Sequence, residues 1–279
     1  MVVFQCNDNI CADAETITDA KPDETDVQDD EFDGFDGLTF TVEGVNFKMV
    51  RVEGGTFTMG ATPKQEDDAD DDELLTHQVT LSSYYIGQVP VTQQLWMAVM
   101  GENPSHFSRL NNYRDCYCRP VESVSWKDCK RFIKRLNMLL NDQLNGMHFR
   151  MPTEAEWEFA ARGGNKGKDS DHKYAGSDDI SEAAWYQGVS RHETHPVMQK
   201  QPNELGLYDM SGNVWEWCAD RFDDNSSETQ QNPTGPASGS SRVNRGGSWR
   251  SIAWSCRVSY RVNNTPADAY SYFGLRLAL

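Results

Sequence analysis

The last forty residues of the 279-residue chain alternate two kinds of sequence, and this alternation is the feature that most constrains the fold. Short blocks rich in Gly, Arg and Trp are separated by runs that show no hydrophobic period and are rich in Tyr, Ser, Asn and Arg. The blocks are Arg242–Trp249, Cys256-Arg257, Thr265-Pro266 and Gly274–Leu277. Binding loops use side chains of the intervening types for rigid contact area and adaptable hydrogen bonds. We therefore expect a rigid frame that carries a binding surface.

The acidic residues are concentrated in two segments. The net charge of the chain is −17, but residues 1–37 hold twelve Asp or Glu and one Lys, and Glu66–Glu73 holds seven acids. The remaining residues hold 24 acids and 25 Lys or Arg, so the folded body is nearly neutral. Repulsion and few apolar side chains predict a disordered tail over 1–37 and a solvated loop at Glu66–Glu73. No basic stripe is interleaved with aromatic residues, so we expect no nucleic-acid partner.

The N-terminus leaves two localisations open. Cys6 follows Val2-Val3-Phe4-Gln5, which is typical of the end of a bacterial lipoprotein signal, although the charged start and long apolar stretch of such a signal are missing. One interpretation is display at the bacterial cell surface through a lipid anchor at Cys6, with the acidic tail as a tether. The alternative is a cytoplasmic protein in which Cys6 is ordinary. No apolar run is long enough for a membrane span, and seven cysteines do not indicate a disulfide framework.

One long helix is predicted near the middle of the chain. Ser125 and Asp128 have the spacing of a capping box, and apolar residues then recur at helical spacing. We expect one face of this helix to belong to the core, formed by Cys129, Phe132, Ile133, Leu136, Leu139 and Leu140.

Two further helices and two strands complete the predicted elements. Helices are expected from Thr92 to Gly101 and from the capping box at Thr153 to about Gly163. We interpret the acids in the latter as capping and solvent-exposed residues, namely Glu154, Glu156 and Glu158. Alternating residues at 39–42 and 77–81 indicate strands. Few helices among many short strands and long loops predict an α+β fold.

Several ordered blocks carry a resemblance to a known family. They are Gly55–Gly60, Pro90-Val91-Thr92, Pro120–Trp126, Arg150–Glu158 and Gly206–Trp217. From about Val45 onward the chain resembles the C-type-lectin-like domain of the formylglycine-generating enzyme, or sulfatase-modifying factor, family. The resemblance implies one domain over 38–279 with the C-type-lectin-like fold of the formylglycine-generating enzyme type, in which short strands combine with two or three helices and long loops.

The resemblance also bears on oxidase chemistry. In the oxidases of the family two cysteines hold copper, and the matching positions here are Ser251 and Cys256. A hydroxyl is a poor ligand for Cu(I), which favours soft thiolates. We therefore expect a protein that holds no copper, requires no cofactor and lacks the oxidase activity.

The tail resembles the variable proteins of diversity-generating retroelements, the treponemal kind in particular, in which the C-terminal segment of this fold is diversified. Adenines of a template are randomised in such systems, so Asn codons become other residues, and no candidate position holds Lys, Glu, Gln, Met or Trp. The resemblance implies a variable ligand-binding segment at about 242–279. Its candidate positions are Arg250, Ser251, Ile252, Ser255, Tyr260, Val262, Asn263, Asn264, Asp268, Ala269, Tyr270, Ser271, Tyr272 and Phe273.

A calcium site is a further implication of the family resemblance. One calcium in the family is held around the Gly-Asn-x-Trp-Glu block, and the matching positions here are Asp209, Gly212, Val214 and Glu216, with Gly212 and Val214 acting through backbone oxygens. Two carboxylates and two carbonyls suit a hard cation that takes oxygen ligands. The alternative is a hydrogen-bonded turn without metal.

Three functions remain open. The first is a non-enzymatic, receptor-like or adhesin-like protein whose C-terminal face is diversified to bind varied protein or glycan ligands. The second is a formylglycine-generating-family enzyme or pseudo-enzyme that acts on or binds cysteine-containing peptides. The third is a structural domain without diversification. The first predicts that the candidate aromatic residues share one exposed patch above neighbouring strands, while Trp215, Trp217 and Trp249 are buried.

Overall fold

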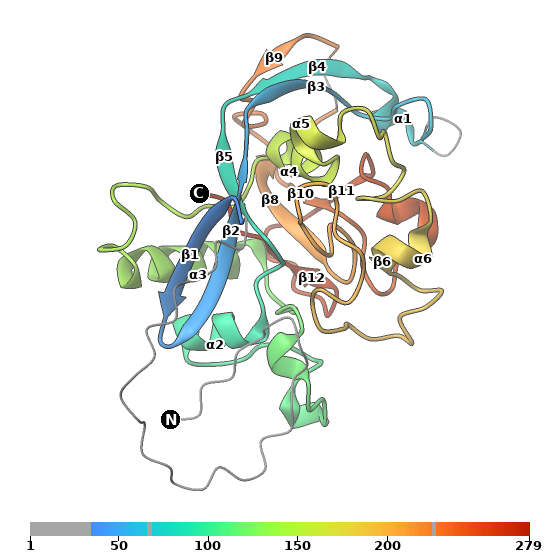
Figure 1. Cartoon of the computed structure of the whole chain (residues 1–279). Coiled ribbons are helices and arrows are strands. Elements are labelled where there is room, and N and C mark those ends of the chain that lie inside the picture. The colour runs from blue at the N-terminus through green and yellow to red at the C-terminus, as the bar shows by residue number, and fades with distance from the viewer. Residues whose placement is uncertain (1–34, 66–68, 225–226) are drawn as a thin grey trace, which may run out of the picture.

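The computed structural model describes residues 35–65, 69–224 and 227–279. The predictions for the acidic tail up to residue 34, including the lipid anchor at Cys6, lie outside the described residues. The described chain combines short strands, few helices and long loops (Figure 1). The α+β prediction is therefore confirmed.

The strands form four small sheets (Figure 1). The first has the order β1-β2-β5 and contains β1 (Gly37–Val42), β2 (Val45–Val52) and β5 (Tyr84–Gly87). The second has the order β3-β4-β9 and contains β3 (Gly55–Met59), β4 (His77–Leu81) and β9 (Gln230–Gln231). The C-terminal sheet has the order β11-β10-β8-β12 and contains β8 (Trp215–Arg221), β10 (Arg242–Arg245), β11 (Arg261–Asn264) and β12 (Phe273–Gly274). The fourth pairs β6 (Ala184–Trp185) with β7 (Ser211–Gly212).

The three predicted helices are present. They are α2 (Gln93–Met100), α3 (Trp126–Leu139) and α4 (Glu154–Ala161). Ser125 and Thr153 form the predicted capping boxes, and Gly101 ends α2 in the left-handed region at φ 81°. The single-turn helices are α1 (Asp71–Leu74), α5 (Gly164–Gly167) and α6 (Ile180–Ala183), and the 3-10 helices are η2 (Arg109–Asn111), η3 (Cys116–Cys118) and η4 (Ala253–Cys256).

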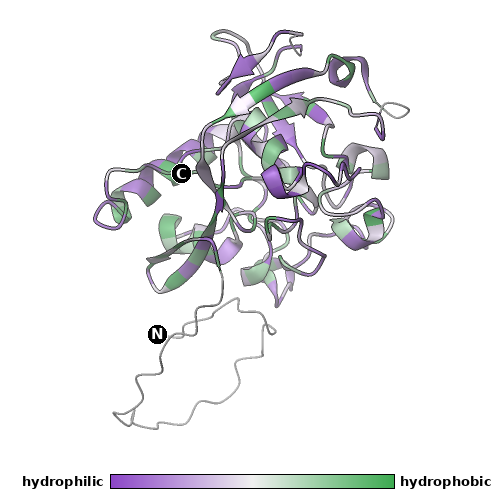
Figure 2. Cartoon of the chain, turned by 45° about the horizontal axis from the view of Figure 1, so that its top comes forward, coloured by the Kyte–Doolittle hydropathy of each residue, from purple (hydrophilic) through white to green (hydrophobic). Residues whose placement is uncertain are grey.

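Hydrophilic and hydrophobic residues mix along each helix (Figure 2). Within residues 35–65, 69–224 and 227–279, no helix has the length and apolar character that crossing a bilayer requires.

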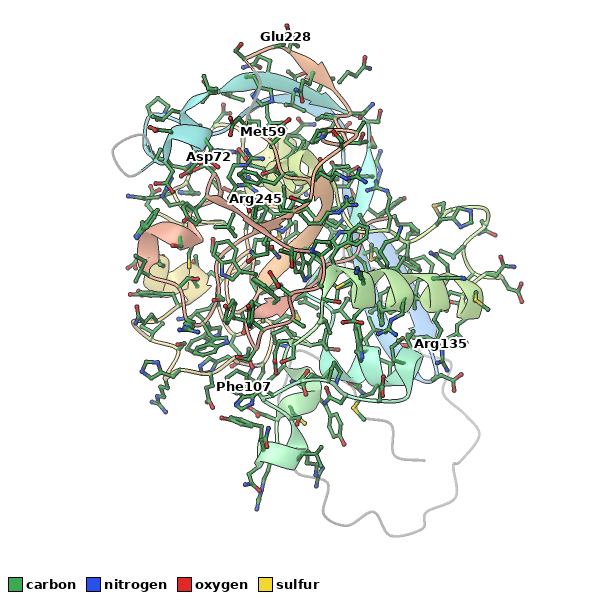
Figure 3. All side chains as sticks on the ribbon, turned by 180° about the vertical axis from the view of Figure 1, so that it is seen from behind. Met59, Asp72, Phe107, Arg135, Glu228 and Arg245 are labelled. Carbon is green, nitrogen blue, oxygen red and sulfur yellow. The ribbon has the colours of Figure 1, made fainter. Side chains whose placement is uncertain are left out.

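Helix α4 lies at the centre of the molecule and is buried along its whole length. It packs against β3, β8 and β10, and Trp157 Nε1 donates a hydrogen bond of 2.6 Å to Glu216 on β8. Arg245 of β10 lies beneath Met59 of β3 in this region (Figure 3). The helix therefore connects the second sheet to the C-terminal sheet.

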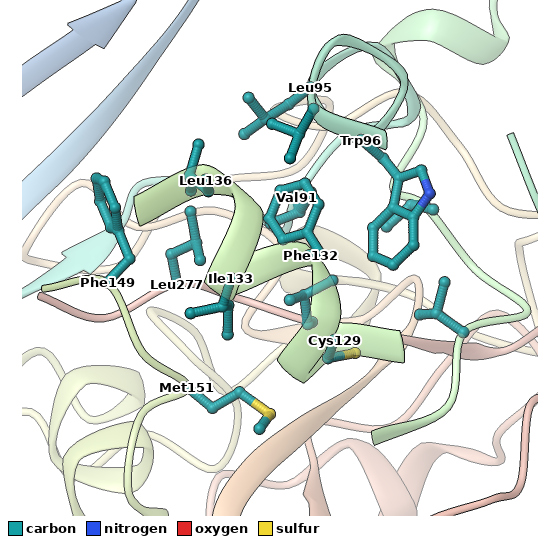
Figure 4. Close-up of a cluster of buried hydrophobic side chains, with 14 of the residues drawn as sticks. Val91, Leu95, Trp96, Cys129, Phe132, Ile133, Leu136, Phe149, Met151 and Leu277 are labelled. Carbon is teal, nitrogen blue, oxygen red and sulfur yellow. The ribbon is translucent and has the colours of Figure 1, made fainter. Parts of the chain in front are cut away.

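Helix α3 packs with α2 and the β1–β2 hairpin around a large hydrophobic cluster (Figure 4). Trp96 stacks on Phe132 with ring centroids 4.8 Å apart. The prediction that Leu139 belongs to this core was wrong, since 44% of its side chain is exposed. The buried stripe runs from Leu136 to Leu140, four residues further along, which leaves Leu139 at its edge.

Candidate ligand-binding face

Four buried arginines anchor the C-terminal segment to the rest of the fold. Each one forms an ion pair with a glutamate that comes from an element far away in sequence. The pairs are Arg245–Glu158, Arg257–Glu73, Arg261–Glu154 and Arg276–Glu216. Removing one partner of such a pair leaves an uncompensated charge in the interior. We call these four pairs the arginine frame.

The pair of Arg257 and Glu73 corrects a prediction about the acidic loop. Two hydrogen bonds of 2.8 and 2.7 Å join the guanidinium to the carboxylate, and both side chains are fully buried. Ser259 donates a further bond of 2.6 Å to Glu73. The interpretation of Glu66–Glu73 as a solvated loop was therefore wrong at its C-terminal end, where α1 docks against the C-terminal segment. Residues 66–68 lie outside the described part of the chain.

The glutamates of α4 are also structural. The interpretation of Glu154, Glu156 and Glu158 as solvent-exposed was wrong, because all three are buried and paired with arginine. Burial on its own raises the pKa of Glu154, but Arg261 and Arg245 outweigh it and hold that pKa below its ordinary value. The helix thus presents two carboxylates to the C-terminal sheet as anchoring points.

Most candidate variable positions reach solvent above this frame. Exposed ones are Arg250, Ile252, Asn263, Ala269 and Tyr270, and partly exposed ones are Ser251, Tyr260, Val262, Asn264, Asp268, Ser271 and Tyr272. Trp215, Trp217 and Trp249 are buried as predicted. Buried anchors thus alternate with solvent-reaching side chains along one stretch of sequence.

Contacts between these side chains bring separate parts of the segment together. The Tyr270 and Tyr272 rings stack with centroids 5.3 Å apart, and the Arg250 guanidinium lies 5.6 Å from the centre of the Tyr272 ring. Trp215 links this group to Tyr260, since its amide donates to the Tyr272 carbonyl at 2.8 Å and its ring lies 6.0 Å from the Tyr260 ring. These contacts join Arg250, Tyr260, Tyr270 and Tyr272, and we use the name C-terminal face for the whole set of twelve solvent-reaching candidates.

Two candidates do not belong to that face. Phe273 is only 2% exposed and packs between Tyr272 and Trp217, so the prediction that it lies on the exposed patch was wrong. Ser255 is buried in η4. Side chains alternate between the two sides of an extended chain. Phe273 of β12 therefore points into the core, whereas the preceding Tyr272 reaches solvent.

The support beneath the face also differs from the prediction. The expected neighbouring strands at Gly246–Trp249 and Cys256-Arg257 are instead an irregular loop and the end of a 3-10 helix. The strands β10 and β11 lie just outside these blocks, and of the Gly274–Leu277 block only Gly274 is in a strand. Gly247 has φ 75°, and a Cβ there would lie 2.6 Å from the Cys256 sulfur. The glycines therefore allow the loop to pass close to η4.

The two positions that match copper ligands have different environments. Ser251 Oγ accepts a hydrogen bond of 3.0 Å from the Ser248 amide and is bound within the local turn. Cys256 is fully buried, and burial raises the pKa of its thiol to about 12. At the two positions that match copper ligands, the protein therefore has a hydroxyl and a neutral thiol.

The two carboxylates of the predicted calcium site accept hydrogen bonds within the protein. Glu216 accepts bonds of 2.8 to 3.1 Å from Arg276 and a bond from Trp157. Asp209 accepts 3.0 and 3.1 Å bonds from the Met198 amide and Asn213. Across the described residues, no three His, Cys, Asp or Glu side chains gather as metal ligands. Calcium binding stays a prediction, and it would have to rely on Asp209 with the Gly212 and Val214 carbonyls.

The fold and these blocks define the class of protein. The chain belongs to the family described as the sulfatase-modifying factor enzyme 1-like domain, whose model matches residues 39–279. The family predicted from the sequence is confirmed.

Within that class, the chain is similar to a variable protein. Variable protein 1 of Treponema denticola superposes with a TM-score of 0.75 at 36% identity, over 86% of this chain and 98% of that one. The predicted resemblance to treponemal variable proteins is therefore confirmed.

Two curated relatives show the breadth of the family. The chaperone protein LppX of Paenibacillus barcinonensis is 33% identical over 263 residues, which is 77% of this chain and 83% of that protein. The formylglycine-generating enzyme of Streptomyces coelicolor is 35% identical over 178 residues, which is 57% of this chain. The matched region spans about half, 52%, of that enzyme.

Proposed function

We propose that this protein is a non-enzymatic ligand-binding protein whose C-terminal face is diversified by a retroelement to meet varied targets. The observation that carries the proposal is the division within one segment, where buried arginines and the buried Trp249 alternate with solvent-reaching Tyr, Asn, Ser and Arg. Such a division lets the surface change while the fold is kept. The similarity to variable protein 1 of Treponema denticola supports the proposal.

The ligand we propose is a protein or a glycan on another cell or molecule. Tyr260, Tyr270 and Tyr272 supply large rigid contact area, and Arg250 and Asn263 supply adaptable hydrogen bonds, as in other evolved binding surfaces. The function requires no cofactor. We further propose display at a bacterial cell surface through a lipid anchor at Cys6.

An oxidase function is less well supported by the residues present. Copper-dependent oxidation in this family would need two soft ligands, and Ser251 offers a hydroxyl. The remaining thiol, Cys256, is held neutral by burial. We therefore expect that the purified protein given Cu(I) and a cysteine-containing peptide forms no formylglycine. Product formation with turnover would overturn the non-enzymatic proposal, whereas copper binding by Ser251→Cys without turnover would agree with it.

Binding itself can be tested on arrays of bacterial and host surface proteins and glycans. The expected result is a selective ligand for the full chain, lost in the double variant Arg250→Ala, Tyr270→Ala. Met138→Ala is the matched control, because Met138 is also a large exposed side chain but lies on α3, outside the C-terminal face. Equal loss in both variants, or loss in neither, would contradict the proposed face.

Diversification has a separate genetic test. The proposal requires a near-copy of the DNA that encodes residues 242–279, with adenines at the candidate codons, beside a reverse-transcriptase gene. Absence of such a copy from the complete genome would remove the retroelement from the proposal and leave ligand binding to the array experiment.

A further inference from the structure

A cavity of about 660 Å³ is lined by α3 and by β8 and β10 of the C-terminal sheet. The loop that precedes α4 and residues 232–234, which follow β9, also contribute to its walls. None of the fourteen candidate variable residues lines it, so this site is independent of the proposed function. Cavities of this size that combine apolar walls with a few polar groups are the usual sites of small molecules.

One wall of the cavity is apolar. It contains Tyr84 together with Ile133, Phe149 and Met151, which are labelled in Figure 4. All four side chains are at most 6% exposed, because most of their surface packs into the core. Their positions are therefore fixed by the fold. The wall offers a preformed contact for the apolar part of a ligand.

Two cations that line the cavity share the ring of Trp126. The Arg242 guanidinium lies 4.0 Å and the Lys130 ammonium 5.7 Å from the centre of this ring. Trp126 Nε1 donates a hydrogen bond of 3.0 Å to the Cys218 carbonyl of β8, which holds the ring in place. Contacts between a cation and an aromatic face are attractive but leave the positive charge in place. The ring therefore positions two positive charges at the cavity.

No carboxylate of the described chain neutralises these two charges. Arg242 Nη1 donates to the Ala219 carbonyl at 2.6 Å, and neither Arg242 nor Lys130 forms an ion pair within the described ranges. Among the described residues that line the cavity, Glu156 is the one with a carboxylate side chain, and Arg150 binds both of its oxygens at 2.6 and 2.7 Å. The lining therefore carries an excess of positive charge.

The strand pairing adds repulsion to this excess. Arg242 of β10 lies directly opposite Arg221 of β8, and like charges at opposite positions of an antiparallel pair are destabilising. Burial lowers the pKa of Arg242, and repulsion by Arg221, which exceeds the attraction by Asp220, lowers it further. Local conflicts of this kind are expected at functional sites. An anion bound beside Arg242 would offset the repulsion.

We propose that this cavity binds an organic anion, a carboxylate on a short apolar body. The carboxylate accepts hydrogen bonds from the Arg242 guanidinium, whose planar fork of N–H groups matches two carboxylate oxygens, and from the Lys130 ammonium. The apolar body contacts the wall that contains Ile133, Phe149 and Met151. An inorganic anion uses the two cations but not this wall, so the organic anion fits the whole lining better.

Calorimetric titration of the full chain with phenylpropionate, phenylpropanol and acetate tests the proposal. The first probe shares its apolar body with the second and its carboxylate with the third. The affinity for phenylpropionate should exceed that for either of the others by about tenfold or more. It should fall by a similar factor in Arg242→Gln, whose amide can still donate to the Ala219 carbonyl, and in Lys130→Gln. Lys134→Gln is the matched control and should bind as the original chain does, because Lys134 is also an exposed cation of α3 but does not line the cavity.

Four results would overturn the proposal. Equal affinity for phenylpropanol would show that charge is not recognised, and equal affinity for acetate would show that the apolar wall is not used. Unchanged affinity in a folded Arg242→Gln or Lys130→Gln variant would place the anion elsewhere, and an equal loss in Lys134→Gln would indicate diffuse attraction to the cations of α3. Thermal unfolding shows whether each variant keeps the fold. Lys130 is exposed, so Lys130→Gln still decides the matter if Arg242→Gln does not fold.

Discussion

Single buried residues decide whether the C-terminal segment is held in place. Arg257 and Glu73 are fully buried and are 184 positions apart in sequence. Their pairing connects the end of η4 to α1, so α1 and the candidate binding segment form one unit. A buried pair of this kind is weak support for net stability, because desolvation offsets much of the attraction, but it strongly disfavours any state in which one partner is alone.

Breaking this pair should therefore cost more than replacing it. Arg257→Met or Glu73→Met alone should lower the free energy of unfolding by about 3–5 kcal/mol, because each leaves a buried charge. The double variant should recover most of that loss. Urea denaturation of the four proteins measures both effects, and single losses below about 1 kcal/mol would mean that the charges are solvated when one partner is removed.

A second prediction at this scale concerns pH and stability. Burial raises the pKa of Asp220 in the folded state to about 7, from 3.8, and that of Glu122 to about 7, from 4.5. An acid with a raised pKa binds its proton more tightly when folded, so it lowers stability as the pH rises from about 4 through 7. Asp220→Asn should be more stable than the original chain by about 2–4 kcal/mol at pH 8 and nearly equal to it at pH 4. Denaturation at both pH values checks this, and an equal difference at the two would contradict it.

Elements with a strong local signal were predictable from the sequence. The caps at Ser125 and Thr153, with the helical spacing that follows, correctly placed α3 and α4. The environments of their side chains were less predictable. An acid in the first turn of a helix fits the capping pattern whether or not it also pairs with an arginine that is distant in sequence. Glu154 pairs with Arg261, which is 107 positions away in sequence, and the spacing of nearby residues does not predict such a contact. The arginines at 245, 257, 261 and 276 were the available signal, since three of them lie in the C-terminal blocks and a buried arginine requires a paired partner.

Helix α3 offers a direct test of the limits of periodicity. Leu136 is fully buried, whereas Leu139, in the same helix and of the same type, is 44% exposed. Leu136→Ala should lower the free energy of unfolding by about 2–5 kcal/mol, because it removes core contacts and leaves a cavity. Leu139→Ala should change it by about half a kcal/mol or less. Chemical denaturation of both variants decides, and similar losses would place Leu139 in the core.

At the scale of the molecule, the arginine frame joins the C-terminal segment to α1, α4 and β8, which are far away in sequence. The loops that follow β10, η4 and β11, together with β11 itself, carry the solvent-reaching side chains of the C-terminal face. Strand β11 shows both roles, because Arg261 pairs with Glu154 inside the protein while Val262 and Asn263 reach solvent. The family blocks predicted the fold from the sequence, but the ion pairs of the frame join distant segments and had no local pattern.

This anchoring predicts that the five exposed side chains of the C-terminal face can be exchanged together without loss of the fold. A variant with new side chains at Arg250, Ile252, Asn263, Ala269 and Tyr270 together should keep its cooperative unfolding, with each exposed change contributing about half a kcal/mol or less. Adding Phe273→Asn to the same variant should lower the free energy of unfolding by about 3 kcal/mol more, because the ring is buried against Trp217. Calorimetry of the two variants beside the original chain measures this contrast. Unfolding of the five-residue variant, or tolerance of Phe273→Asn, would show that the boundary between frame and variable surface has been drawn in the wrong place.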